Sequence, residues 1–126
     1  TLWERFFRDE DDKPFSMNHH FWGDISAWFI KCLAGIRLNP QGNNIHYVEI
    51  RPSFVTALDS AAGYHIAPDG KIASSWQRSG NKITLNVEVP KNMTATIIAE
   101  KGFSFTDGEI SKEIASGKYT YSLVPR

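Results

Sequence analysis

The hydrophobic pattern of this chain changes its period near Pro40. Before that point, apolar residues recur every three to four positions, as they do on one face of a helix. After it, apolar and polar residues alternate, which places successive side chains on opposite faces of a strand. The pattern therefore predicts one long helix followed by a mostly β structure with a buried face.

Short alternating segments bounded by Pro, Gly or Asn fill the second part of the chain. Asp69-Gly70 is a strong two-residue hairpin turn, because such pairs adopt positive φ readily, and residues 79–81 form another turn signal. Short strands at this spacing predict an antiparallel β-sandwich of the jelly-roll type. The expected strands are 46–50, 55–58, 62–67, 72–78, 83–89, 93–99 and 119–123.

The first part of the chain predicts a single long amphipathic α-helix over about residues 18–34. Ser16 or Asn18 can cap its start, and Gly35 can adopt positive φ and end it. Such an aromatic face needs more partner surface than the remaining chain supplies, so homo-oligomerisation or aggregation through it is expected for the chain alone. The face consists of Phe21, Trp22, Ile25, Trp28, Phe29, Cys32 and Leu33.

Charge and composition argue against several classes of partner. Basic and acidic residues both number 14, so the net charge is zero and no broad nucleic-acid footprint is expected. No apolar run is long enough to span a bilayer. Cys32 is the only cysteine, so it cannot form an intrachain disulfide, and its apolar context favours burial. The chain begins with Thr1 and shows no signal peptide, so an upstream segment is expected.

Polar residues near the N-terminus lie among aromatic rings. Glu4, beside Trp3, could be poised as a general base by desolvation or by Arg5, although an exposed terminal Glu is the commoner situation. His19, at the expected helix start, could donate a hydrogen bond to a ligand hydroxyl or simply face solvent. The acidic run 8–13 is typical of a solvated loop and could alternatively bind a hard cation.

No metal or cofactor is assigned from the sequence. His19 and His20 are adjacent, and neighbouring residues of a helix point about 100° apart, so they are poorly placed to share a metal ion. No glycine-rich phosphate loop, paired-cysteine motif or nucleophile elbow is present in the sequence.

Two N-terminal motifs carry a family resemblance. Thr-Leu-Trp-Glu-Arg at 1–5 and Ser-Met-Asn-His at 16–19 resemble the end of the catalytic barrel of bacterial α-L-rhamnosidases of glycoside hydrolase family 78. In the β-rich part, residues 50–52 and 87–96 are similar to that family's C-terminal β-domain. His20 departs from the family pattern, which usually has Tyr there.

The resemblance implies an inverting hydrolase of terminal α-L-rhamnose, built on an (α/α)6 barrel with accessory β-domains. Residues 1–38 would form the end of that barrel, and residues 39–126 the C-terminal β-sandwich. The implied partners are a rhamnose-containing glycan or glycoside and the upstream barrel of the same protein. A periplasmic or extracellular location is favoured over a cytoplasmic one.

The resemblance also implies roles for single residues. Glu4 would be the general base, and His19 and Trp3 would contact the sugar. Inversion needs a second carboxylic acid about 6.5–9.5 Å from the first, to leave room for water. In the family that acid lies far upstream, so this chain is expected to be inactive by itself.

The alternative is a non-catalytic carbohydrate-binding or structural β-sandwich. Sugar-binding sandwiches present solvent-facing aromatic rings, and the candidates here are Tyr64, Trp76, Tyr119 and Tyr121. Alternation places Tyr119 and Tyr121 on one face, which could equally be the core face. A third possibility is a purely structural cap over the barrel.

Overall fold

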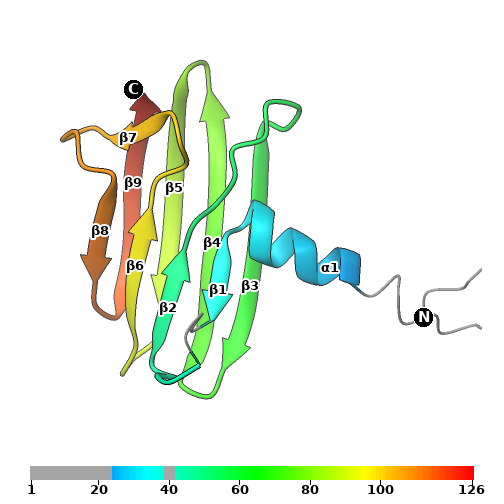
Figure 1. Cartoon of the computed structure of the whole chain (residues 1–126), viewed down its shortest axis with the longest axis vertical. Helices are drawn as coiled ribbons and strands as arrows, with labels where there is room; N and C mark the ends of the chain where they lie inside the picture. Colours follow the sequence, from blue (N-terminus) through cyan, green and yellow to red (C-terminus); the bar gives the residue numbers. More distant parts are fainter. Residues whose placement is uncertain (1–23, 39–41) are drawn as a thin grey trace, which may run out of the picture.

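The computed structural model describes residues 24–38 and 42–126, and these form a β-sandwich with a short helix at one edge (Figure 1). The four-stranded sheet has the order β1-β2-β6-β8, and the five-stranded sheet has the order β3-β4-β5-β9-β7. Buried residues from both sheets make one hydrophobic cluster. The predicted β-sandwich is therefore confirmed.

The strand bounds follow the alternation of the sequence closely where the strands are long. The first sheet contains β1 (Ile36–Leu38), β2 (Tyr47–Ile50), β6 (Thr94–Ile98) and β8 (Ser111–Ile114). The second contains β3 (Ser60–Ala67), β4 (Gly70–Ser79), β5 (Lys82–Val89), β7 (Phe103–Phe105) and β9 (Gly117–Pro125).

One predicted strand was wrong, and three short strands were missed. Residues 55–58 are not a strand, because Leu58 N–H donates to the Val55 carbonyl at 3.1 Å and closes a turn. The short strands β1, β7 and β8 were not predicted, since three or four residues are too few to show alternation.

The sandwich is also not purely antiparallel, as the jelly-roll prediction required. β2 and β6 run parallel, with Val48 opposite Ala95 and Ile50 opposite Ile97. A parallel pair needs a long crossover connection. Here β3, β4 and β5 of the other sheet supply it, so the crossover itself forms the larger sheet.

The core forms where the two inner faces meet. In β5 every second residue is buried, from Ile83 to Val89. Trp76 of β4 is 1% exposed and packs edge-to-face against Phe54, with ring centroids 5.4 Å apart. The alternation that predicts β5 thus places its apolar side chains in the core.

The helix lies at the edge where β1 and β3 approach each other (Figure 1). It consists of α1 (Asp24–Trp28) and a π-helical turn, η2 (Phe29–Leu33), in which Ala34 N–H donates to the Phe29 carbonyl at 3.1 Å. The described helix is therefore short, which corrects the prediction of a long helix over 18–34. Residues 18–23 and the predicted caps lie outside the described residues.

Gly35 ends the helix, as predicted, and it lies in close contact with the backbone of Arg51 and Pro52. Its φ is +77°, and a Cβ there would lie 2.2 Å from the carbonyl carbon of Arg51 and from the nitrogen of Pro52. The Gly35 carbonyl also accepts a hydrogen bond from Arg51 N–H at 2.8 Å. Only glycine fits both the backbone conformation and this contact.

Replacing Gly35 therefore tests the packing of the helix end. Gly35→Ala is expected to lower the free energy of unfolding by at least about 3 kcal/mol, because overpacking against backbone adds to the cost of positive φ. Gly80→Ala is the matched control, since Gly80 has a φ of +60° with nothing within 4 Å of its Cβ position. Denaturant unfolding should show a loss of about 1–2 kcal/mol for the control. Equal losses in the two variants would contradict the close contact.

Candidate functional site

The residues predicted to act on substrate lie outside the described part of the chain. Trp3, Glu4 and His19 all fall within residues 1–23, as does the acidic run 8–13. Their roles remain predictions. Across residues 24–38 and 42–126, no group of three or more His, Cys, Asp or Glu side chains is placed to hold a metal ion. No helix in the same ranges is long and apolar enough to cross a membrane.

Trp76 is a structural residue and not a sugar platform. It is buried in the core, and its indole N–H donates to the Leu33 carbonyl at 2.9 Å. This bond satisfies a carbonyl at the end of the helix, where backbone acceptors lack intrahelical partners. Trp76 therefore ties the helix to the larger sheet.

Tyr119 and Tyr121 are half-buried and belong to the inner face of β9. Their rings stack at 6.1 Å, and Tyr121 also packs edge-to-face against Phe105. Burial raises the pKa of the Tyr121 hydroxyl, with the neighbouring Tyr119 adding to the effect. Of the four aromatic candidates, only Tyr64 is largely exposed, at 59%. One ring does not make the row of solvent-facing rings that the prediction of a binding module required.

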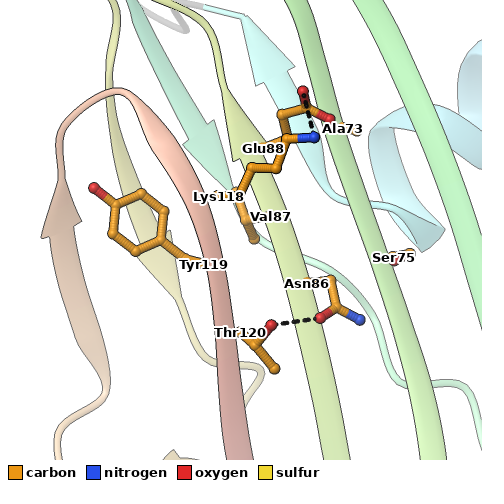
Figure 2. A pocket seen from close by; sticks show the side chains of 8 residues that line it. All are labelled: Ala73, Ser75, Asn86, Val87, Glu88, Lys118, Tyr119 and Thr120. Atoms are coloured by element: carbon orange, nitrogen blue, oxygen red, sulfur yellow. Dashed lines mark hydrogen bonds and ion pairs between the residues drawn. The ribbon is translucent and has the colours of Figure 1, made fainter.

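A shallow hollow lies on the outer face of β4, β5 and β9 (Figure 2). Its volume is about 320 Å³, and its polar lining includes Asn86, Glu88, Lys118 and Thr120. These groups pair across strands: Thr120 Oγ1 donates to Asn86 Oδ1 at 2.8 Å, and Lys118 Nζ lies 3.5 Å from Glu88. The polar lining is thus largely satisfied by cross-strand pairs of the sheet surface.

Another satisfied cluster lies at the β8 edge. Lys112 donates to Asp107 and, at 2.8 Å, to Glu109. The bond to Asp107, followed by that to Glu109, raises the pKa of Lys112, while the bond from Lys112 lowers the pKa of Asp107. His46 similarly contacts Asp69 at 2.6 Å and joins two loops. These pairs stabilise local structure.

The helix presents an apolar surface to solvent. Ile25, Trp28 and Phe29 are each about half-exposed, and α1 has no buried residue. The Trp28 and Phe29 rings contact each other edge-to-face at 5.5 Å. Cys32, in η2, is only half-buried. We call Ile25, Trp28 and Phe29 the helix surface.

A second hollow, of about 550 Å³, lies beside the helix surface, where the helix meets β1 and β3. Three of its lining residues are basic: Lys31, Arg37 and His65. Sequence reasoning missed this site. The three residues are spread over more than thirty positions and meet only through the packing of helix and strands, so the sequence carries no local signal for them.

Comparison with known proteins places the chain in a family. The family model described as bacterial alpha-L-rhamnosidase C-terminal domain matches residues 35–103, which is more than half of the chain. The chain belongs to this family. The match begins at Gly35, the residue that ends the helix, and it includes β1 to β6. The resemblance found in the sequence is confirmed.

Individual relatives agree with this assignment. An alpha-L-rhamnosidase of Alteromonas sp. (strain LOR) is 26% identical over 138 aligned residues, covering 98% of this chain and 15% of the relative. An alpha-L-rhamnosidase of Formosa agariphila is 34% identical over 103 residues, covering 77% of this chain and 11% of the relative. The chain thus spans about an eighth of the length of these relatives.

Solved structures of similar proteins share the fold of this chain. An alpha-L-rhamnosidase of Streptomyces avermitilis, solved in complex with L-rhamnose, matches with a TM-score of 0.71 and 26% identity, over 97% of this chain and 13% of that one. The alpha-L-rhamnosidase from Dictyoglumus thermophilum matches with a TM-score of 0.77 and 22% identity, over 98% and 16% of the two chains.

The structural role of Trp76 can be tested by removing its donor. Trp76→Phe is expected to lower the free energy of unfolding by about 1–3 kcal/mol, because the buried Leu33 carbonyl loses its partner. The exposed Tyr64→Phe should change it by less than about 0.5 kcal/mol. Thermal or denaturant unfolding measures both, and an unchanged stability of Trp76→Phe would contradict the role of this bond.

Proposed function

We propose that this chain is the C-terminal part of an alpha-L-rhamnosidase-type glycoside hydrolase that releases terminal α-L-rhamnose with inversion. The family match over residues 35–103 carries the proposal. It is supported by relatives named alpha-L-rhamnosidase that align with nearly the whole chain. Because the chain spans only 11–15% of those relatives, we assign the activity to the longer protein.

In this proposal, the part of the chain before Gly35 completes a helical catalytic barrel, and the residues from β1 (Ile36–Leu38) onward form the accessory β-sandwich. The boundary expected between residues 38 and 39 moves forward because β1 pairs with β2. Glu4 is the general base, which takes a proton from the water that attacks the anomeric carbon. Trp3 and His19 contact the sugar. A second carboxylic acid protonates the leaving oxygen from the opposite side, about 6.5–9.5 Å from the base. It belongs to the upstream part of the protein, so the chain alone is inactive.

The β-sandwich has a structural role in this proposal. Its only buried tryptophan among the residues described serves the core, and the polar groups of its outer hollow bond mainly to one another. The helix surface, by contrast, exposes aromatic rings that a folded protein normally covers. We infer that the sandwich caps the barrel and that the helix surface packs against it.

Glu4→Gln in the full-length protein tests the mechanism. The amide cannot accept a proton from water, so kcat on an aryl α-L-rhamnoside should fall by about 10²–10⁴-fold, the usual contribution of a general base. Thermal stability should stay unchanged. Glu113→Gln on exposed β8 is the matched control and should keep full activity.

Two results would contradict this proposal. An unchanged kcat in the Glu4 variant would remove Glu4 from the mechanism. Turnover of the rhamnoside by the isolated 126-residue chain, well above background, would overturn the division of the acid and base between the two parts.

Self-association of the isolated chain tests the helix surface. We expect sedimentation velocity to show concentration-dependent oligomers, because the aromatic rings that normally face the barrel would then face a second copy. Trp28→Glu should restore a monomer. Ile110→Glu is the control, since Ile110 is exposed to nearly the same extent (51% against 52%) but lies outside the helix surface. A monomeric wild-type chain at every concentration would contradict the prediction.

A further inference from the structure

The hollow beside the helix is lined by basic and apolar groups together. Lys31 comes from η2, Arg37 from β1 and His65 from β3, and the remaining lining residues are Ala27, Ile30, Ile36 and Leu38. No carboxylate is among the lining residues that the structure describes. Two permanent positive charges and an imidazole therefore share a hollow of about 550 Å³ without an acidic side chain in its lining.

Arg37 contributes a partly buried guanidinium group to this hollow. Its Nε atom is buried and has no hydrogen-bond partner among residues 24–38 and 42–126. Glu49 lies opposite Arg37 in the β1–β2 register, yet the Nε atom remains without a bond. Buried donors are nearly always satisfied in folded proteins, and arginine favours carboxylate acceptors. Arg78 Nε is in the same state, so this atom alone does not identify an occupant, and it is the charge of the Arg37 guanidinium in the hollow that favours a carboxylate.

The hollow is continuous with the helix surface. Ala27, Ile30 and Lys31 lie in the same helix as Trp28 and Phe29, and this helix projects from the β1–β3 edge (Figure 1). Leu38, at the other side of the hollow, is 43% exposed. Exposed apolar groups next to a few charged ones are the composition of a protein interface, in which arginine and aromatic residues are enriched.

We propose that this hollow receives an Asp or Glu side chain from the upstream part of the same protein, with apolar neighbours of that acid covering Leu38 and the helix surface. The proposal rests on the proposed function, because that function places a large catalytic part before this chain. The length of the relatives supports the same occupant, since more than four-fifths of each lies outside the region matched by this chain.

Charge disfavours a second copy of this chain as the occupant of the hollow in the full-length protein, whereas the self-association expected of the isolated chain involves the aromatic rings of the helix surface. In a two-fold symmetric contact the same patch faces itself, so the basic hollow of one copy would oppose the basic hollow of the other. Like charges at such a contact repel and lose hydration. An acidic side chain from elsewhere supplies the opposite charge and an acceptor for Arg37.

Zero-length crosslinking of the full-length protein tests this proposal. A carbodiimide joins a lysine amine to a carboxylate only when the two are in contact, and peptide mass spectrometry identifies the pair. We expect Lys31 to be crosslinked to an Asp or Glu upstream of this chain. The Lys112 pair with Glu109, at 2.8 Å, is the internal positive control.

Charge-reversal variants then test whether the crosslinked pair holds the helix in place. Lys31 is exposed, so Lys31→Glu should fold normally and should loosen docking, seen as faster hydrogen exchange of residues 24–38 in the full-length protein. Replacing the crosslinked acid by Lys in the same protein should restore the slow exchange. Lys82→Glu, an exposed lysine on β5, is the matched control and should leave exchange of these residues unchanged.

Each other outcome overturns the proposal and identifies a different occupant. A crosslink from Lys31 to residues 8–13 would make the chain's own acidic run the occupant, and an intermolecular crosslink would indicate a second copy. No Lys31 crosslink alongside an intact control crosslink would mean that no carboxylate docks there. Rhamnosidase activity is measured separately, so a failure of the proposed function is distinguishable from a failure of this docking.

Discussion

The contact between Gly35 and the peptide that joins Arg51 to Pro52 determines how the helix leaves the sandwich. At this point the backbone of the helix end touches the backbone that follows β2, without a side chain between them. Two further hydrogen bonds fix the same junction: Ser53 N–H donates to the Cys32 carbonyl at 3.0 Å, and Trp76 donates to the Leu33 carbonyl. Both sheets thus hold the end of the helix, while its start projects away from them.

This arrangement gives the two halves of the helix different environments. Leu33 and Ala34 are buried in the sandwich, and the close approach of Gly63 to Ala34 lets η2 lie directly on β3. α1 has no buried residue, although it contains Ile25 and Trp28. The sandwich therefore anchors the end of the helix, and in the proposed arrangement the upstream barrel covers its exposed apolar side chains.

The features that the sequence predicts correctly are those determined by local chemistry. β5 alternates over its full length, a two-residue turn at Pro68-Asp69, one position before the predicted Asp69-Gly70, joins β3 to β4, and Gly35 ends the helix. The parallel pairing of β2 with β6 could not be predicted, because alternation marks the buried face of a strand without naming its neighbour. The basic hollow could not be predicted either, since His65 meets Lys31 only after β3 and the helix pack together. The family motifs indicated candidate catalytic and sugar-binding residues, which periodicity alone cannot do. All of these residues lie before Asp24, outside the described part of the chain.

The way in which polar groups are satisfied distinguishes the surfaces of this domain. On the outer face of the larger sheet, Asn86 bonds to Thr120 and Lys118 pairs with Glu88. A ligand that bound there would have to break these pairs first and would lose their free energy. Arg37 lies in a different situation, because no carboxylate is among the described residues that line its hollow. A carboxylate that entered this hollow would meet the charges of Lys31 and Arg37 without displacing an acidic side chain of the described lining. The hollow beside the helix is therefore better suited to an acidic partner than the polar face of the larger sheet is.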